Sequence, residues 1–312
     1  MEFGAAFWIQ RSDWPALRDA ALAAEDAGFD AVWFDDHLLS DEGDWPDPKL
    51  EGWLTLAALA PLTTRVRLGH LVVANTFRNP GLTAKLATTL DHASGGRFTL
   101  GLGGGWFERE HDAFGLDFGS GFGERLDRLE EAAGLIQRLL AGERVTHEGR
   151  FYQMRDAVCE PRPIQARLPI LIGGSGRTKT LRTVARHADL WNGYGEPARI
   201  AEVSGWLRDR CAEEGRPFES IVRTVAMDVV IRDSAIAAQR AYDEVTAFQG
   251  IAPERTGSDG TERGLNAGGP AELIADYVRR FEAIGIAQVV WIFRAPWDRE
   301  TIARLPEVRA LF

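Results

Sequence analysis

Short apolar runs alternate with longer stretches of mixed apolar and polar residues along the whole chain. The mixed stretches place their apolar residues three or four positions apart, as on one face of a helix. In the stretch 124–140, this face carries Leu126, Leu129, Ala133, Ile136 and Leu140. The short runs have the length of buried strands. Their alternation with helices predicts repeated strand–helix units around a parallel sheet.

The pattern predicts eight strands with helices between them. The strands are expected at residues 2–9, 29–34, 66–74, 97–102, 168–172, 189–193, 221–231 and 286–293. The helices are expected at residues 13–28, 52–60, 79–92, 124–140, 177–186, 237–248 and 271–283. Residues 143–167 are expected to form a surface excursion, and residues 251–269 a mobile loop. This order predicts an α/β fold, a (β/α)8 TIM barrel with insertion segments, although an open doubly wound sheet would show the same alternation.

Composition is consistent with one such barrel. The chain has 312 residues, and about 250 suffice for the fold. No linker separates regions of different composition, so we predict a single domain over residues 1–312. Acidic residues outnumber basic ones by 46 to 36, and the arginines are scattered. Nucleic acid is therefore not an expected partner, because binding to a phosphate backbone needs a basic surface.

Cysteine usage and hydropathy indicate a cytoplasmic protein. Cys159 and Cys211 lie far apart and neither belongs to a CxxC motif, so neither a disulfide framework nor a zinc site is expected. The N-terminus lacks the basic and apolar regions of a signal peptide. No apolar run approaches the roughly 18 residues of a membrane span. We expect no contact with a membrane.

Ligands of α/β folds gather where strands end, so the residues after each predicted strand are candidates for chemistry. The second strand is followed by Asp35, Asp36 and His37. An imidazole titrates near neutrality, and an adjacent carboxylate can fix its tautomer, which suits a general acid or base. A helix cap with a surface histidine would look the same. A metal site is not predicted, because no second histidine cluster could complete it.

Two glycine-rich segments also follow predicted strands. Residues 101–106 read GLGGGW, and residues 173–178 read GGSGRT just before a predicted helix. Glycines let a flat ligand or a phosphate approach the backbone, although a tight turn would also need them. Free N–H groups at the helix start, together with Arg177, favour an anion site. Neither segment matches the dinucleotide fingerprint or the P-loop.

Four stretches together resemble the bacterial-luciferase-like superfamily, in particular its members that depend on coenzyme F420, a deazaflavin. They are AGFDAVWFDDH at 27–37, residues 66–115 from VRLGHLVVANTF to HDAFG, LPILIGGSGRTKTLRTVARHADLWNGYG at 168–195, and GGPAELIADYVRRFEAIGIAQVV at 268–290. They cover most of the chain in the family's order. The resemblance favours the barrel over the open sheet.

The resemblance also implies a cofactor site. Asp36 and His37 match the pair beside the reactive edge of the deazaflavin. Leu71 and Val72 match a strand bulge that contains a non-prolyl cis peptide behind the central ring. The remaining expected contacts line the ring or bind the phosphate; they are Ala74, Gly104, Gly105, Gly174, Ser175, Gly176, Arg177 and Thr178.

Two positions depart from the family's sugar-phosphate dehydrogenases. Trp106 stands where those enzymes carry a catalytic glutamate, and Asp41 stands where they carry a cofactor-shielding tryptophan. A glucose 6-phosphate substrate is therefore not implied.

We accordingly predict an enzyme that transfers a hydride between F420 and an unidentified small organic molecule. His37 is the expected proton partner, and Asp36 is expected to orient it; Glu51 and Glu108 are weaker candidates. The family implies a homodimer. The alternatives are an FMN-dependent monooxygenase and a non-catalytic cofactor-binding barrel. The Asp36–His37 pair and the glycine segments argue against the non-catalytic barrel.

Overall fold

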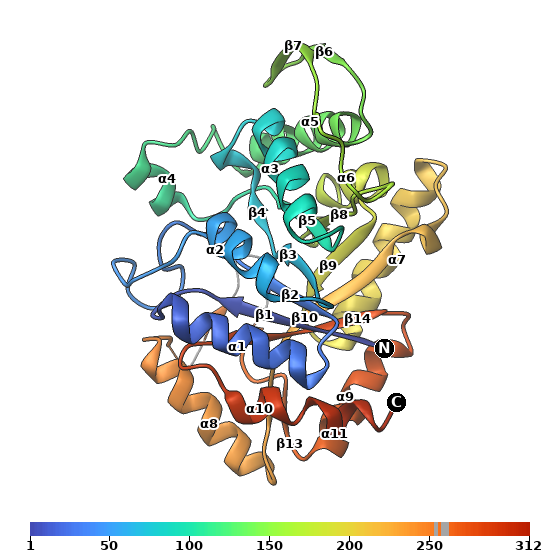
Figure 1. The fold of residues 1–312 in the computed structure, drawn as a ribbon. Coiled ribbons are helices and arrows are strands. Elements are labelled where there is room, and N and C mark those ends of the chain that lie inside the picture. The colour runs from blue at the N-terminus through green and yellow to red at the C-terminus, as the bar shows by residue number, and fades with distance from the viewer. Residues whose placement is uncertain (253–254, 257–261) are drawn as a thin grey trace.

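Eight parallel strands close into a barrel in the computed structural model, which describes residues 1–252, 255–256 and 262–312 (Figure 1). The strands pair in the order β1, β2, β3, β5, β8, β9, β10 and β14, and β14 pairs with β1 to close the ring. Their bounds are β1 (Glu2–Trp8), β2 (Ala31–Phe34), β3 (Arg67–His70), β5 (Phe98–Gly103), β8 (Ile170–Gly173), β9 (Leu190–Tyr194), β10 (Val222–Ile231) and β14 (Gln288–Arg294). The predicted (β/α)8 barrel is confirmed.

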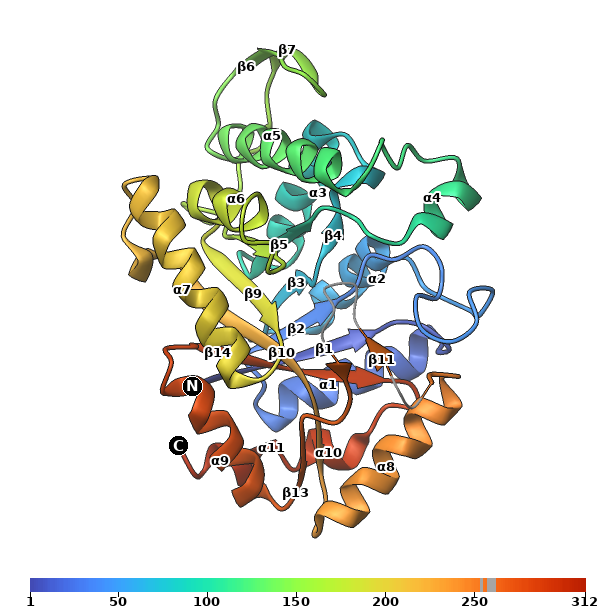
Figure 2. The same ribbon diagram turned by 180° about the vertical axis from the view of Figure 1, so that it is seen from behind.

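Helices cover the outside of the barrel in views from opposite sides (Figure 1 and Figure 2). They are α1 (Trp14–Ala27), α2 (Gly52–Leu59), α3 (Pro80–Ala93), α4 (Glu108–Phe114), α5 (Phe122–Leu140), α6 (Thr180–His187), α7 (Pro197–Glu213), α8 (Ala235–Phe248), α9 (Ala271–Glu282), α10 (Arg299–Ala303) and α11 (Leu305–Arg309). Local signals explain their ends. Asp13 caps α1 by accepting the N–H of Ala16, and Gly28 ends that helix at φ 99°.

Two helices before the last strand were not predicted. In α7 the buried residues Ile200, Val203, Leu207 and Cys211 have helical spacing, and Pro197 stands in the first turn. The sequence signal for α7 was therefore present, although the many charged residues between these positions dilute it. The other helix, α4, has only seven residues, and its burial is confined to Glu110 and His111. A hydrophobic pattern cannot reveal such a helix, because both buried side chains are polar.

The third strand is interrupted where the sequence predicts one continuous strand over 66–74. After β3 the peptide bond Leu71–Val72 is cis, in agreement with the family resemblance, and β4 (Val73–Ala74) continues beside β5. The bulge lies very close to β5: a Cβ on Gly101 would stand 1.9 Å from the carbonyl oxygen of His70. A Cβ on Gly103 would stand 2.6 Å from the side chain of Val72. These two glycines therefore make room for the chain's own bulge.

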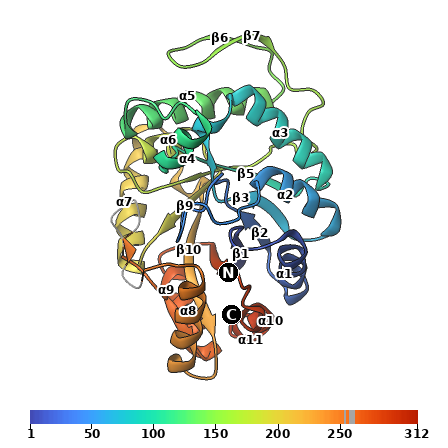
Figure 3. The same ribbon diagram turned by 90° about the vertical axis from the view of Figure 1, so that its left-hand side faces the viewer.

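The two predicted insertion segments contain short strands. Within 143–167, β6 (Val145–Glu148) and β7 (Gln153–Ala157) form an antiparallel hairpin that stands away from the barrel (Figure 3). Within 251–269, β13 (Ala267–Gly269) extends the pairing of β10, and β11 (Arg255–Thr256) pairs with β12 (Glu262–Arg263). The mobile loop expected there falls partly on residues 253–254 and 257–261, which lie outside the described residues.

The barrel interior is filled by side chains rather than open. Trp33 is buried there, and glycines pack against it: a Cβ on Gly69 would stand 2.5 Å from the Trp33 ring. Trp8 and Leu71 pack in the same buried cluster. A larger apolar core separates the strands from the outer helices. No helix in the described part of the chain is long and apolar enough to cross a membrane.

Candidate active site

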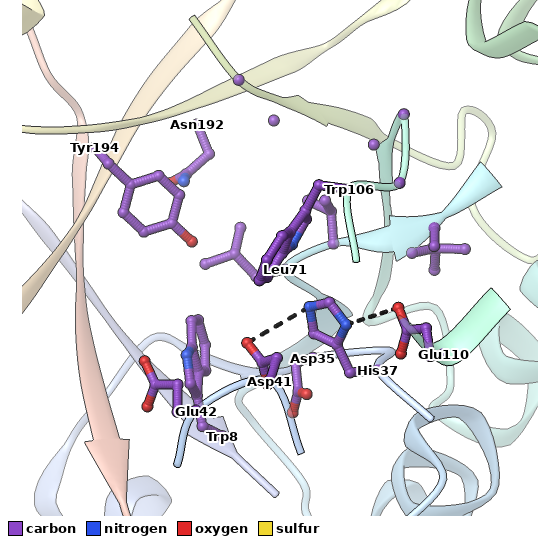
Figure 4. Close-up of a pocket in the computed structure, with 18 of the residues that line it drawn as sticks. Trp8, Asp35, His37, Asp41, Glu42, Leu71, Trp106, Glu110, Asn192 and Tyr194 are labelled. Atoms are coloured by element: carbon purple, nitrogen blue, oxygen red, sulfur yellow. Dashed lines mark hydrogen bonds and ion pairs between the residues drawn. The ribbon is translucent and has the colours of Figure 1, made fainter. Parts of the chain in front are cut away.

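A cavity of about 600 Å³ lies at the carboxyl ends of the barrel strands (Figure 4). Trp8 and Leu71 belong both to its wall and to the interior cluster, so the interior side chains close its inner end. Its wall also contains Trp106, Phe122, Asn192 and Tyr194. The Leu71–Val72 bulge and several glycines give another part of the wall little side-chain bulk. Such a surface fits a flat ring system.

His37, three residues beyond β2, is held between two carboxylates in this cavity (Figure 4). Its Nδ1 lies 2.9 Å from Oε1 of Glu110, which α4 contributes. Its Nε2 lies 3.6 Å from Oδ2 of Asp41. Glu110 is itself fixed, because its other oxygen accepts the N–H of Leu38 at 2.9 Å. The imidazole therefore has a defined orientation.

The charge of His37 follows from these neighbours. Burial alone would lower the pKa of His37, but Asp41 and Glu110 outweigh burial and raise this pKa to about 9. The pKa of His37 therefore lies above the near-neutral value that the sequence analysis expected. A pKa in this range favours the protonated form of His37 at neutral pH.

Asp36 does not take the role that the sequence predicted for it. Its carboxylate accepts two hydrogen bonds from Arg78, at 2.7 and 3.1 Å, and a third from the N–H of Ala74 at 3.3 Å. Its side chain forms no hydrogen bond or ion pair with the His37 side chain, and Asp36 is not among the described residues that line the cavity. Glu110 and Asp41 orient His37 instead. The Asp36 carboxylate instead anchors β4 through the N–H of Ala74, which lines the cavity.

Lys49 forms part of the same buried network, although no motif in the sequence indicated it. Its ammonium lies 2.5 Å from Asp35 and 3.1 Å from Asp41, and its side chain is 2% exposed. Burial favours the neutral amine, but the two carboxylates raise the pKa of Lys49 above its usual value. Asp41 thus contacts a different cation with each of its oxygens.

A second buried ion cluster stands beside the cavity. Arg294 at the end of β14 contacts Glu42 at 2.6 and 3.1 Å and also contacts Asp228. Glu42 lines the cavity, as do Asp35, Asp41 and Glu110. Within the described part of the chain, no lysine or arginine lines it. The polar part of the wall is therefore acidic.

The predicted cofactor contacts fall into two groups. Those at the strand ends line the cavity, namely Leu71, Val72, Ala74, Gly104, Gly105 and Gly174. Those further along the second glycine segment, Ser175, Gly176, Arg177 and Thr178, are not among its described lining residues. There the helix begins at Thr180 rather than at residue 177, and Arg177 is exposed with its guanidinium 5.4 Å from the ring of Trp206.

The weaker candidates lie outside the cavity wall. Glu51 caps α2 by accepting the N–H of Leu54 at 2.7 Å, and it also pairs with Arg78 at 3.0 Å. Glu108 is exposed in the first turn of α4. Neither carboxylate is placed to contact a ligand in the cavity.

Comparison with known proteins identifies the family. The sequence model described as luciferase-like monooxygenase matches residues 1–290. An F420-dependent glucose-6-phosphate dehydrogenase of Microbacterium testaceum is 41% identical over 168 residues, which are 53% of this chain and 48% of that protein. The pyrimidine monooxygenase RutA of Methylobacterium radiotolerans is 33% identical over 232 residues, or 70% of this chain and 60% of that protein. The similarity thus spans about half to three fifths of these relatives.

A solved structure has the same barrel. It is an F420-dependent secondary alcohol dehydrogenase in complex with an F420–acetone adduct. The TM-score is 0.82 at 19% identity, and the alignment covers 98% of this chain and 97% of that one. At this identity the likeness shows the fold alone. Because the family model matches nearly the full length, the chain belongs to the luciferase-like monooxygenase family.

Proposed function

We propose that this protein is an oxidoreductase that transfers a hydride between coenzyme F420 and a small organic substrate. The observation that carries this proposal is a cavity that combines the Leu71–Val72 bulge with a partly buried, oriented His37. A flat redox cofactor needs a wall without bulky side chains and a group that can exchange a proton near its reacting edge, and this cavity has residues of both kinds. Relatives named as F420-dependent enzymes favour the deazaflavin.

Different residues of the chain would bind different parts of the cofactor. Leu71, Val72, Ala74, Gly104 and Gly105 would contact the ring system. The segment from Gly174 through Ser175, Gly176 and Arg177 to Thr178 would receive the phosphate, because its backbone N–H groups precede a helix. When bound, a deazaflavin supplies a centre that accepts or donates a hydride. His37 would hold or move a proton at the substrate, and Asp36 would support the wall through Ala74.

An FMN-dependent monooxygenase is the second candidate, and the similarity to RutA favours it. The same wall would accept either ring system. A non-catalytic cofactor-binding barrel is less well supported, because it has no use for a histidine held between two buried carboxylates.

Side-by-side fluorescence titrations with F420 and with FMN test the proposal. We expect F420 to bind more tightly than FMN. Reduced F420 bound to the protein should also resist oxygen, whereas a reduced flavin would react with it. Micromolar binding of FMN without detectable binding of F420 would establish the second candidate instead.

We further propose that the enzyme is a cytoplasmic homodimer, that residues 1–312 form one domain, and that its partners are small molecules rather than nucleic acid or membrane. Sedimentation velocity at micromolar concentration tests the dimer directly.

A further inference from the structure

The contacts of His37 specify where its protons are. Glu110 accepts the N–H of Leu38 with one oxygen and faces Nδ1 of His37 at 2.9 Å with the other. A carboxylate is an acceptor only, so Nδ1 carries a hydrogen and donates it. A neutral imidazole has just one N–H, which leaves a lone pair on Nε2. That lone pair would face the Asp41 carboxylate at 3.6 Å.

A lone pair facing a carboxylate is repelled, whereas an N–H⁺ in the same place is attracted. Protonation of Nε2 therefore makes the interactions of His37 with both Glu110 and Asp41 attractive. The distance of 3.6 Å is too long for a hydrogen bond, so Asp41 stabilises the charge without engaging the Nε2 hydrogen. Since His37 lines the cavity, this hydrogen is available to a ligand atom there.

The other charged groups around His37 do not cancel this effect. Lys49 is the cation that opposes the charge of His37, and it is shared between Asp35 and Asp41. Two arginines of the neighbouring ion clusters are likewise held by two carboxylates each: Arg78 by Asp36 and Glu51, and Arg294 by Glu42 and Asp228. The surroundings of His37 thus carry more negative than positive charge.

We propose that His37 rests as an imidazolium held by Glu110 and Asp41, and that it donates its Nε2 proton to the oxygen of an uncharged aldehyde or ketone. This inference rests on the proposed function. The carbonyl carbon gains a hydride, and with it two electrons, from the reduced cofactor, which becomes oxidised. The carbonyl oxygen gains the proton, an alcohol is formed, and His37 is left neutral until water reprotonates it.

The direction and the substrate class follow from the same arrangement. Oxidation of an alcohol would need a neutral His37 as base, which the two carboxylates disfavour. Among the described lining residues His37 is the one cationic side chain, and the carboxylates of Asp35, Asp41, Glu42 and Glu110 line the cavity with it, so an anionic substrate would have no lysine or arginine to pair with there. Apolar contacts from Trp8 and Trp106 suit an uncharged molecule. Glu110 and Asp41 are positioning residues in this scheme.

The first test needs no cofactor. The protein is labelled with ¹³C and ¹⁵N in histidine, and the His37 signals are assigned by their loss in His37→Asn. We expect both ring nitrogens of His37 to be protonated at pH 7.5. Glu110→Gln and Asp41→Asn should each lower the titration midpoint of His37, by about one to three pH units. Glu108→Gln, which removes an exposed carboxylate from the same helix, should leave it unchanged.

A neutral His37 at pH 7.5 in the wild-type protein would overturn the inference. So would midpoints that stay the same in both carboxylate variants. The F420 titration is a separate measurement, so failure to bind F420 refutes the proposed function without changing the NMR result.

The second test uses reduced F420 with a panel of uncharged aldehydes and ketones and their carboxylate-bearing analogues. Uncharged members should oxidise the cofactor faster than the matched anions. The alkaline limb of the rate profile should move to lower pH in Glu110→Gln, in step with the NMR midpoint, and should return toward the wild-type position in Glu110→Asp. A purely structural role of Glu110 would lower the rate without moving this limb. Reduction of none of the uncharged compounds, or a preference for the anions, would overturn the proposed direction and substrate class.

Discussion

His37 is the residue whose substitution separates chemistry from binding. His37→Asn keeps polarity and approximate size but cannot donate a proton from an imidazolium. Because the contribution of a proton donor exists mainly in the transition state, turnover should fall by roughly a hundredfold or more. Cofactor affinity should change much less. Stopped-flow hydride transfer, measured beside a cofactor titration of the same variant, checks this. An unchanged transfer rate would remove His37 from the mechanism.

Arg177 tests the predicted phosphate contact. It is exposed and lies over the ring of Trp206, so it is free to turn toward an anion at the glycine segment. Arg177→Ala should weaken F420 binding roughly tenfold or more, because charge-assisted hydrogen bonds contribute about 1.5–3 kcal/mol. Binding of the phosphate-free chromophore should change little.

Arg199 provides the matched control, since its guanidinium lies 4.8 Å from the same ring. Arg199→Ala should not weaken F420 binding. Equal losses for F420 and for its phosphate-free chromophore in Arg177→Ala would show that Arg177 does not contact the phosphate.

The sequence indicated that polar residues follow β2, but it did not indicate which side chains contact one another there. It placed His37 at the end of β2, and the structure puts His37 in the cavity wall. Successive side chains of an extended segment point to opposite sides, so Asp36 turns to Arg78 while His37 faces the cavity. The actual partner, Glu110, is 73 residues further along the chain on a short polar helix. No local pattern specifies such a contact.

The interrupted strand is the element on which the cavity wall depends most. A Cβ at Gly101 would stand 1.9 Å from the His70 carbonyl oxygen, so β5 and the bulge must separate in Gly101→Ala. We expect this variant to lose about 1–3 kcal/mol of the free energy of unfolding, as overpacked cores do. Urea denaturation monitored by tryptophan fluorescence measures the loss.

Gly205 in α7 is the matched control for the same substitution, because a Cβ there meets nothing within 4 Å. Gly205→Ala should leave stability unchanged or raise it by roughly 0.5–1 kcal/mol, since alanine favours the helix. Equal stability of Gly101→Ala and the wild-type protein would mean that β5 tolerates displacement at the bulge.

At the scale of elements, hydrophobic periodicity and the residues that begin or end helices located most of the barrel's strands and helices. The boundaries of β1, α1 and α3 agree with the prediction to within one or two residues, because Asp13, Gly28 and Asn79 mark helix ends. The break between β3 and β4 was invisible to periodicity, since Leu71 and Val72 are as apolar as their neighbours. Only the family resemblance indicated it. The start of α6 was misplaced because a turn at 177–179 continues the glycine segment.

Closure is the property of the whole molecule that the pattern could not provide. An open sheet and a barrel differ in whether the first and last strands pair, and that contact joins residues such as Ala5 and Trp291. Alternation along the chain is the same in both. Charge has a similar limit: the total of −10 does not reveal that several carboxylates gather around the cavity. Those positions converge only once the barrel closes.

Because the cluster around His37 is buried, its charge affects the stability of the whole protein. The folded-state pKa of His37 is raised from 6.5 to about 9, so its stabilising contribution is complete below pH 6.5 and is lost as the pH rises through 9. The lowered pKa of Asp41 acts on the other side, and its contribution is lost only below pH 3.8. The free energies of unfolding of wild type and His37→Asn should therefore differ most between pH 4 and 6.5. This difference should shrink by about 3 kcal/mol by pH 10. Urea denaturation of both proteins across this range tests the linkage, and a difference that stays constant from pH 6 to 10 would contradict it.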